Sequence, residues 1–173
     1  MGAQPDDFAE FYEASYGRMV ALVTAIVGDR QQAEDIAQEA FARALARWPQ
    51  IARYDLPEAW VRRVALRLTV DARRRLRRAL QLSAWLTAGQ RGGEQPPDPL
   101  ASTALTVALM RLPVAQRQVI VLYYLADLPV DDIARDTAVS VGTVRNRLAA
   151  ARRRLERELT DFDEAEKEVP SAR

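Results

Sequence analysis

The sequence predicts an all-α protein made of two small helical domains joined by a flexible linker. Apolar residues recur at steps of three and four along most of the chain, and no stretch of useful length alternates as a strand would. Residues 89–99 break this pattern, because they hold three of the seven glycines and three of the nine prolines. Such a composition is typical of a linker, and 173 residues are enough for two small domains.

The first expected domain spans residues 5–86 and begins with an amphipathic helix. An apolar stripe that starts at Phe8 ends at Gly28. Asp29 then stands where a helix N-cap is expected, with Gln32 three residues later as in a capping box. This spacing predicts a second helix directly after the glycine.

The second helix is expected to end at Pro49, and a loop is expected from there to Leu56. Pro57 fits the first turn of a third helix, because the missing N–H of a proline is not needed there. The apolar periodicity carries this third helix past Trp60 to about Leu80.

The linker is expected at residues 87–102 and the second domain at residues 103–160. The helical period returns there in four stretches, and an acidic tail covers residues 161–173. For this tail, a solvated segment and one that folds over a basic face are both open. The four expected helices are about 102–111, 113–126, about 130–137 and 141–159.

The chain has no cysteine and no histidine. Disulfides, Cys/His zinc sites, cysteine nucleophiles and histidine acid–base catalysis are therefore excluded. We expect no catalytic residue, no metal and no cofactor. The longest apolar run, Met19–Val27, is too short to span a bilayer, and no secretory signal is recognised, so the cytoplasm is the expected location.

Positive charge is concentrated in two blocks, although the formal net charge is only +1. Residues 61–80 contain eight arginines and one aspartate, and residues 111–157 contain nine arginines and five acidic residues. Residues 1–60 are acidic, with ten carboxylates against five arginines. Two basic blocks separated by neutral sequence indicate two contacts with a polyanion.

The segment Val130–Leu148 has the pattern of a DNA-binding helix-turn-helix. Ala134 is the small residue needed where the two helices cross, and Ser140 can cap the second helix. Ala138 stands where glycine is common, at a cost of about 1 kcal/mol if the turn is left-handed. The alternative is an ordinary helix pair with a solvated basic face. The second helix presents Gly142, Thr143, Arg145, Asn146, Arg147, Ala149, Arg153 and Arg157 away from its apolar side.

This second domain resembles the C-terminal half of a bacterial extracytoplasmic-function (ECF) sigma factor of the sigma-70 family. The similarity rests on Leu112-Pro113, Arg117, Asp132-Ile133-Ala134, Val139 through Leu148, Ala151-Arg152 and Leu155. The resemblance implies that this domain binds the −35 promoter element. The implied DNA contacts are Arg117, Ser140, Gly142, Thr143, Arg145, Asn146, Arg147 and Arg153.

The first domain resembles the N-terminal half of the same family in two places. The run from Ala33 to Phe41 is similar to the polymerase-binding helix, and the run from Trp60 to Ala65 with Asp71, Arg74 and Arg75 is similar to the helix that contacts the −10 element. The implied polymerase contacts are Asp35, Gln38 and Glu39. The implied −10 contacts are Arg53, Tyr54, Trp60, Arg63, Arg67 and Arg74.

Several of these residues have a second interpretation. The acidic helix face can be merely solvated, Tyr54 can cover the edge of the core, and Trp60 can be structural rather than a base-stacking platform. Arg67 also departs from the family, which usually has asparagine there. Because a guanidinium accepts no hydrogen bond, it cannot make the two-way contact of an amide with adenine. Either the −10 sequence preference differs, or Arg67 is a phosphate clamp.

We therefore predict an RNA polymerase sigma factor that works by binding alone. The implied partners are promoter DNA and the clamp coiled coil and flap of core RNA polymerase, while an anti-sigma factor is left open. The main alternative is a helix-turn-helix regulator that binds duplex DNA without polymerase. A recombinase or nuclease would need a carboxylate cluster or an activated nucleophile, and the sequence offers neither in an evident place.

Overall fold

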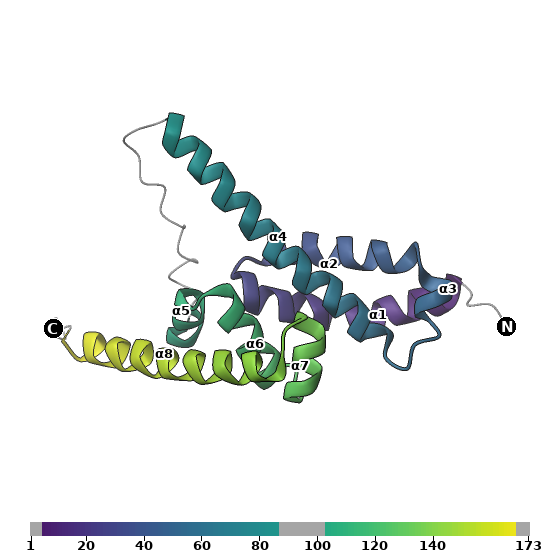
Figure 1. Cartoon of the computed structure of the whole chain (residues 1–173). Helices are drawn as coiled ribbons and strands as arrows, with labels where there is room; N and C mark the ends of the chain where they lie inside the picture. Colours follow the sequence, from purple (N-terminus) through teal and green to yellow (C-terminus); the bar gives the residue numbers. More distant parts are fainter. Residues whose placement is uncertain (1–4, 87–102, 169–173) are drawn as a thin grey trace, which may run out of the picture. The chain divides into compact units, whose positions relative to one another are not determined.

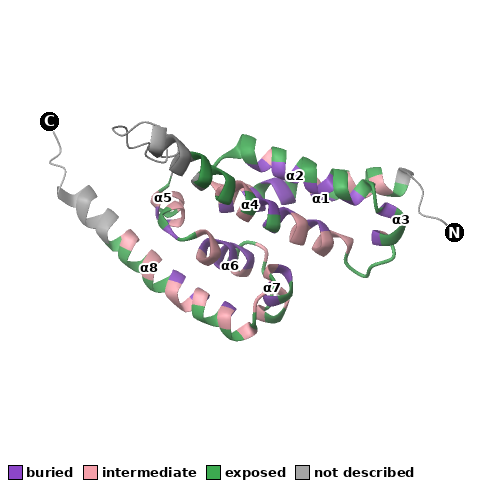
Figure 2. Cartoon of the chain, turned by 45° about the horizontal axis from the view of Figure 1, so that its top comes forward, coloured by how far each residue is buried: buried purple, intermediate pink, exposed green. Residues whose placement is uncertain are grey.

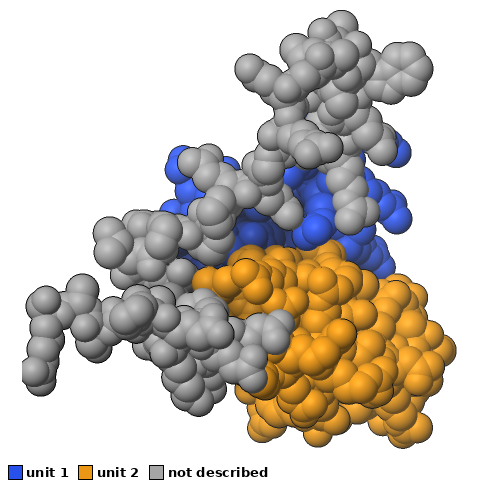
Figure 3. Space-filling model, turned by 90° about the vertical axis from the view of Figure 1, so that its left-hand side faces the viewer, with its two compact units in different colours: residues 1–95 blue, residues 96–173 orange. Residues whose placement is uncertain are grey.

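The structure, a computed structural model, describes residues 5–86 and 103–168, with side chains described for residues 7–76, 78, 79 and 103–160. The described residues form eight α-helices and no strand, which confirms the all-α class (Figure 1). The chain divides into two compact units, residues 1–95 and residues 96–173 (Figure 3). The expected linker at 87–102 lies outside the described residues.

Unit 1 is a bundle of three long helices with one short helical turn. Helix α1 packs on α2 and α4, and α2 also packs on α4. Asp29 accepts a hydrogen bond from the Gln32 N–H at 2.7 Å, so the predicted N-cap of α2 is confirmed. The helices are α1 (Pro5–Val27), α2 (Arg30–Leu45), α3 (Trp48–Ile51) and α4 (Pro57–Leu86).

The core of unit 1 depends on a row of small residues along α2. Ala33, Ala37, Ala40 and Ala44 are fully buried, and their spacing of three and four residues places them on one face (Figure 2). Such a face allows α1 and α4 to approach the α2 backbone closely. Large side chains fill the remaining space at the end of α2 nearest α3.

Those large side chains form an aromatic cluster that joins three helices. Phe11 of α1 stacks on Trp48 of α3 with ring centroids 4.9 Å apart, and Tyr12 meets Phe41 of α2 edge-on at 5.1 Å. Phe41 is 1% exposed, so it belongs to the core. Burial raises the pKa of Tyr12, with a further contribution from Tyr16.

Two expected boundaries in unit 1 are wrong. Helix α2 ends at Leu45 rather than at Pro49, because Arg47 leaves the helical conformation and the separate turn α3 begins at Trp48, with Pro49 in its first turn. The expected loop of residues 49–56 is therefore partly helical. Helix α4 continues to Leu86 instead of about Leu80.

Unit 2 is built around its longest helix. Helix α8 packs on each of the other three helices, and its buried face is formed by Val144, Leu148 and Ala151. The first helix of this unit was expected from about residue 102 but begins at Ala104. Thr103 is its N-cap, because the Thr103 hydroxyl accepts a hydrogen bond from the Thr106 N–H. The helices are α5 (Ala104–Arg111), α6 (Val114–Tyr124), α7 (Val130–Thr137) and α8 (Val141–Glu168).

Helix α8 extends to Glu168, so the first part of the expected acidic tail is helical. The rest of that tail, residues 169–173, lies outside the described residues. Glu158 ties α8 to α5, because Arg111 Nη1 donates to its carboxylate at 2.7 Å. This hydrogen bond is the main cause that lowers the pKa of Glu158. At pH values above the ordinary pKa of a glutamate, this hydrogen bond therefore stabilises the fold. That stabilisation is lost as the pH falls through the lowered pKa of Glu158.

The turn between α7 and α8 has the left-handed residue of a helix-turn-helix. Ala138 has φ 54° and ψ 42°, and the following Val139 N–H donates to the Ala134 carbonyl at 3.1 Å. Ala134 is 7% exposed where the two helices meet. An L-residue with a Cβ is strained in this region, and glycine is not.

Replacing Ala138 with glycine is therefore expected to stabilise unit 2 by about 0.5 to 1 kcal/mol. Ala149→Gly is the matched control, because Ala149 lies inside α8, where glycine should destabilise by about 1 kcal/mol. Urea unfolding followed by circular dichroism measures both. Equal loss of stability in the two variants would contradict the assignment of a strained turn.

Candidate nucleic-acid interface

The first two turns of α8 present polar groups to solvent on a well-fixed backbone. Ser140 accepts from the Thr143 N–H at 3.1 Å, which confirms it as the N-cap, and its hydroxyl lies 2.9 Å from that of Thr143. Gly142, Arg145 and Asn146 are exposed beside them. A helix that enters the major groove of DNA needs such a face near its N-terminus.

Five of the six arginines of α8 fall into two groups. Arg152 donates to the Tyr124 hydroxyl at 2.9 Å and lies 5.3 Å from the centroid of the Tyr123 ring, and Arg154 faces Glu158 at 3.7 Å. These two side chains are held by unit 2 itself. Within the described residues, the side chains of Arg145, Asn146, Arg147 and Arg153 make no hydrogen bond, ion pair or ring contact.

This division selects a candidate set for DNA contact. A guanidinium that the protein leaves without an anion is available for a phosphate or a guanine edge. Arg145, Arg147 and Arg153 meet this condition, together with the amide of Asn146. The sequence spacing put Asn146 and Arg153 on the face opposite the apolar side, with Arg145 and Arg147 beside it, and the structure leaves Arg145 and Asn146 exposed and Arg147 partly exposed.

Arg117 does not belong to this set. Its side chain is 3% exposed, and Nη2 donates to the carbonyls of Met110 at 2.6 Å and Leu112 at 3.0 Å. The sequence-based expectation of a −35 contact is therefore corrected. The guanidinium instead satisfies carbonyl groups at the end of α5, where a helix lacks internal partners and favours a cation.

Gly142 allows folding and DNA approach to be tested separately. A Cβ at this position would meet only Ser140 Oγ, at the ordinary contact distance of 3.9 Å. Gly142→Ala is expected to leave the free energy of unfolding unchanged or raise it by up to about 1 kcal/mol. If the backbone there lies against DNA, duplex binding by the complex with polymerase should weaken about fivefold or more.

The matched control for Gly142→Ala is Gly17→Ala. Gly17 is exposed on α1, and a methyl group added there would meet nothing within 4 Å, so the same change should not alter DNA binding. Fluorescence anisotropy with a labelled duplex measures the binding of both. Wild-type affinity in Gly142→Ala would remove this glycine from the interface.

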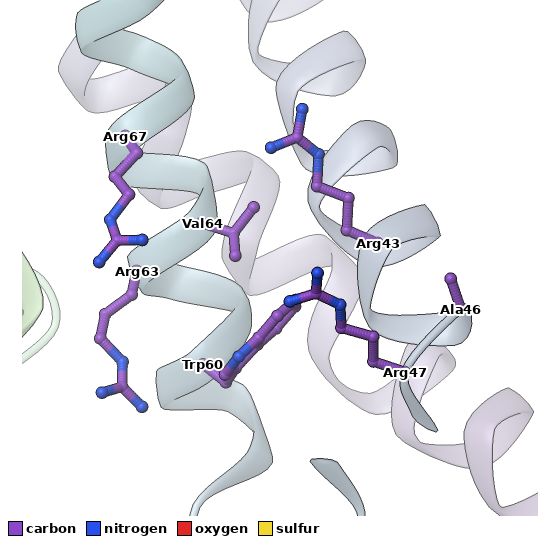
Figure 4. Close-up of a pocket in the computed structure, with 7 residues that line it drawn as sticks. All are labelled: Arg43, Ala46, Arg47, Trp60, Arg63, Val64 and Arg67. Atoms are coloured by element: carbon purple, nitrogen blue, oxygen red, sulfur yellow. The ribbon is translucent and has the colours of Figure 1, made fainter. Parts of the chain in front are cut away.

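A second basic surface surrounds a cavity of about 540 Å³ between α2 and α4 (Figure 4). Trp60 and Val64 point from α4 toward α2, and Arg43 of α2 and Arg47, two residues beyond the end of α2, extend toward α4. Arg63 and Arg67 lie on the other side of α4 in this view. The lining residues are Arg43, Ala46, Arg47, Trp60, Arg63, Val64 and Arg67.

This cavity brings together three of the expected −10 residues, Trp60, Arg63 and Arg67. Trp60 is half-buried and Arg67 is exposed, while Arg63 Nε donates to the Ala59 carbonyl at 3.2 Å. Arg74 is exposed two turns further along α4 and does not line the cavity.

Arg53 and Tyr54 lie in the turn after α3 and are exposed, and neither lines the cavity. Tyr54 is 47% exposed, so its ring is accessible to solvent rather than covering the core. The start of α4 near this turn is tied to α1 by Arg18, which donates to Glu58 at 2.8 Å. That hydrogen bond raises the pKa of Arg18.

The expected polymerase contacts form an exposed polar face of α2. Asp35, Gln38 and Glu39 all face solvent, and Glu39 accepts from Arg43 Nε at 2.7 Å. Sequence reasoning missed Arg43 and Arg47 as members of the cavity. In the sequence, Arg43 and Arg47 follow the acidic residues of this segment and are four residues apart. This change from acidic to basic side chains is the signal that could have indicated a second binding surface near the end of α2.

The comparisons with known proteins agree with both units. Residues 11–79 match the family "Sigma-70 region 2", and residues 102–155 match "Sigma-70, region 4". The chain is 31% identical to the ECF RNA polymerase sigma factor SigW of Bacillus subtilis, over 91% of each chain. This chain is an ECF sigma factor of RNA polymerase.

Other matches support the same family. The sigma factor is 29% identical to the RNA polymerase sigma-E factor of Streptomyces avermitilis, which covers 91% of this chain and 87% of the relative. Its fold is similar to that of the sigma factor RpoE of Bartonella quintana, solved in complex with the anti-sigma factor NepR. That likeness has a TM-score of 0.72 at 22% identity and covers 89% of this chain and 97% of the other.

The described residues of the sigma factor contain neither a cluster of potential metal ligands nor a helix that could span a membrane. Among these residues, no group of three acidic, histidine or cysteine side chains could hold a metal ion. No helix in the same residues is both long enough and apolar enough to cross a bilayer.

Proposed function

We propose that this sigma factor attaches to core RNA polymerase through α2 and contacts promoter DNA through α4 and α8. The contact set on α8 is Ser140, Gly142, Thr143, Arg145, Asn146, Arg147 and Arg153, directed at the −35 element. The set near α4 is Arg53, Tyr54, Trp60, Arg63, Arg67 and Arg74, directed at the −10 element. The polymerase set is Asp35, Gln38 and Glu39.

The observation that carries this proposal is the sorting of the α8 arginines by partner. A solvated basic face would show no order, whereas here Arg152 and Arg154 are held internally and Arg145 and Arg147 are left for a ligand. The first turns of α8 would then lie in the major groove. Strand separation would use binding energy, by trapping unstacked bases near α4, without nucleotide hydrolysis.

Residues 5–86 and 103–160 would act as separate modules, with residues 87–102 as a flexible connection between them. Polymerase would supply the scaffold that fixes the two modules at their distance on DNA. The cytoplasm, where the polymerase works, is the proposed location. An anti-sigma factor is a proposed partner, supported by the complex in which the structural neighbour from Bartonella quintana was solved.

Run-off transcription with purified core polymerase tests the function. We expect the chain to bind core enzyme and to initiate from promoters recovered by selection from a DNA library. A gel shift without polymerase distinguishes a sigma factor from the alternative, a helix-turn-helix regulator, because such a regulator would bind specific duplex DNA without polymerase. Specific binding without polymerase, together with no initiation in its presence, would favour that regulator.

A further inference from the structure

The readily oxidised sulfur atoms of this chain all belong to methionine, because the chain has three methionines and no cysteine. Met1 lies outside the described residues. Met19 is part of the core of unit 1 and is 1% exposed. Met110, in the last turn of α5, is partly exposed. A small oxidant in solvent can therefore approach Met110 but not Met19.

Met110 is also joined to the arginine that fixes the turn between α5 and α6. Arg117 Nη1 donates to the Met110 sulfur at 3.0 Å. Nη2 of the same guanidinium donates to the carbonyls of Met110 at 2.6 Å and Leu112 at 3.0 Å. Arg117 is 3% exposed and Leu112 is 1% exposed. The Met110 side chain thus connects the solvent-facing side of α5 with a buried polar cluster.

We propose that Met110 is a site of reversible oxidation by peroxide, and that its sulfoxide destabilises unit 2. A sulfur lone pair attacks one oxygen of hydrogen peroxide, the S–O bond forms as the O–O bond breaks, and a proton passes to the leaving oxygen. The sulfur is oxidised, the peroxide is reduced, and the products are methionine sulfoxide and water. The consequence for DNA binding rests on the proposed function, whereas the oxidation itself does not.

The geometry around the sulfur predicts the direction of the effect. An N–H···O hydrogen bond needs about 2.9 Å between nitrogen and oxygen, so a new oxygen cannot enter between atoms that are 3.0 Å apart. If the oxygen points toward Arg117, the sulfur must move, or the guanidinium must lengthen its bonds to two carbonyls. If it points away, the positive end of the S=O dipole faces the guanidinium. Both orientations weaken the contacts that hold the turn.

Peptide mass spectrometry of the full chain after treatment with hydrogen peroxide tests the site. Trypsin cleaves after arginine and so places the two methionines in separate peptides, residues 19–30 and 92–111. Met110 is expected to gain oxygen at least about tenfold faster than Met19, which reacts only when the core opens. In urea that unfolds both units, the two rates should become equal. This second measurement is the internal control, because it removes the fold and keeps the sequence.

Unfolding curves test the consequence of oxidation. The sulfoxide is expected to raise the unfolding equilibrium constant of unit 2 about tenfold, as for one lost hydrogen bond to a charged group, and to lower its midpoint temperature by about 5 to 10 °C. Circular dichroism should report this change. Tryptophan fluorescence should not, because Trp48, Trp60 and Trp85 all lie in residues 1–95. Treatment with the reductases for both sulfoxide epimers should restore the original curve.

Met110→Leu is the matched variant, because leucine has a similar volume and no sulfur to oxidise. It lacks only a weak hydrogen-bond acceptor, so it should fold, and its unfolding curve should not move on peroxide treatment. Met19→Leu is the control at the other methionine. It keeps Met110, so peroxide should shift the unfolding of its unit 2 as in the wild type.

Equal oxidation of Met110 and Met19 in the folded chain would overturn the inference, and so would a sulfoxide that leaves the unfolding of unit 2 unchanged. Run-off transcription measures the link to function, with peroxide removed before core polymerase is added. The oxidised chain should lose initiation at a temperature about 5 °C lower than the reduced chain. If the reduced chain does not initiate, the proposed function fails and the oxidation site stands. If both forms initiate alike at every temperature, only this inference fails.

Discussion

Replacing Arg117 with alanine is expected to destabilise unit 2 by about 2 to 4 kcal/mol, although the residue lies in a DNA-binding domain. The guanidinium is 3% exposed and donates to the carbonyls of Met110 and Leu112. Its removal leaves two acceptors at the end of α5 without a partner and opens a cavity beneath Leu112, which is 1% exposed. The turn between α5 and α6 would lose both of these hydrogen bonds.

Two probes separate this effect from any change in unit 1. The three tryptophans, Trp48, Trp60 and Trp85, all lie in residues 1–95, so tryptophan fluorescence reports unit 1 alone. Urea unfolding should show an earlier transition by circular dichroism and an unchanged one by fluorescence. Arg135→Ala is the control, because Arg135 forms only an exposed pair with Asp132 and should cost less than about 1 kcal/mol.

The opposite result would restore the interpretation from sequence. If Arg117→Ala unfolds like the wild type but loses −35 affinity, Arg117 must turn outward to DNA. Arg117→Lys refines the comparison, since lysine keeps the charge but lacks the fork that reaches two carbonyls at once. We expect its stability to lie between those of the wild type and the alanine variant.

Arg117 also shows where sequence reasoning stops. Helices, caps and the left-handed Ala138 were predictable, because each depends on residues within four positions of one another. The direction of an arginine depends on what lies across the fold. Arg152 meets Tyr124 of α6, 28 positions away, and Arg145 of the same helix meets nothing in the described chain. Periodicity gives the face of a helix but not the partner of a side chain.

The cavity in unit 1 illustrates the same limit. Trp60, Arg63 and Arg67 could be grouped from the sequence, because the family resemblance assigns all three to one helix. Arg43 and Arg47 could not be added, because their place depends on how α2 packs against α4. The predicted end of α2 differs from the observed end for a related reason. Trp48 continues the apolar stripe, but it reaches the core from a separate turn.

Replacing Arg145 with alanine is expected to weaken −35 binding by about 5- to 150-fold, the range for one lost bidentate base contact. Arg145 is the fifth residue of α8, near the helix end that we propose enters the groove, and its guanidinium has no partner within the described residues. The free protein should unfold as the wild type does, because nothing internal is lost. Arg154→Ala is the matched control on the same helix, since Arg154 faces Glu158.

The form of the loss distinguishes base reading from phosphate binding. Duplexes selected from a randomised library by the complex with core polymerase define the preferred −35 sequence. If Arg145 reads a base, Arg145→Ala should relax the preference at one or two positions. If Arg147 holds a phosphate, Arg147→Ala should weaken all sequences equally and reduce the salt slope by about 0.9. Equal losses in Arg145→Ala and Arg154→Ala would mean that net charge, and not the sorting of arginines by partner, determines binding.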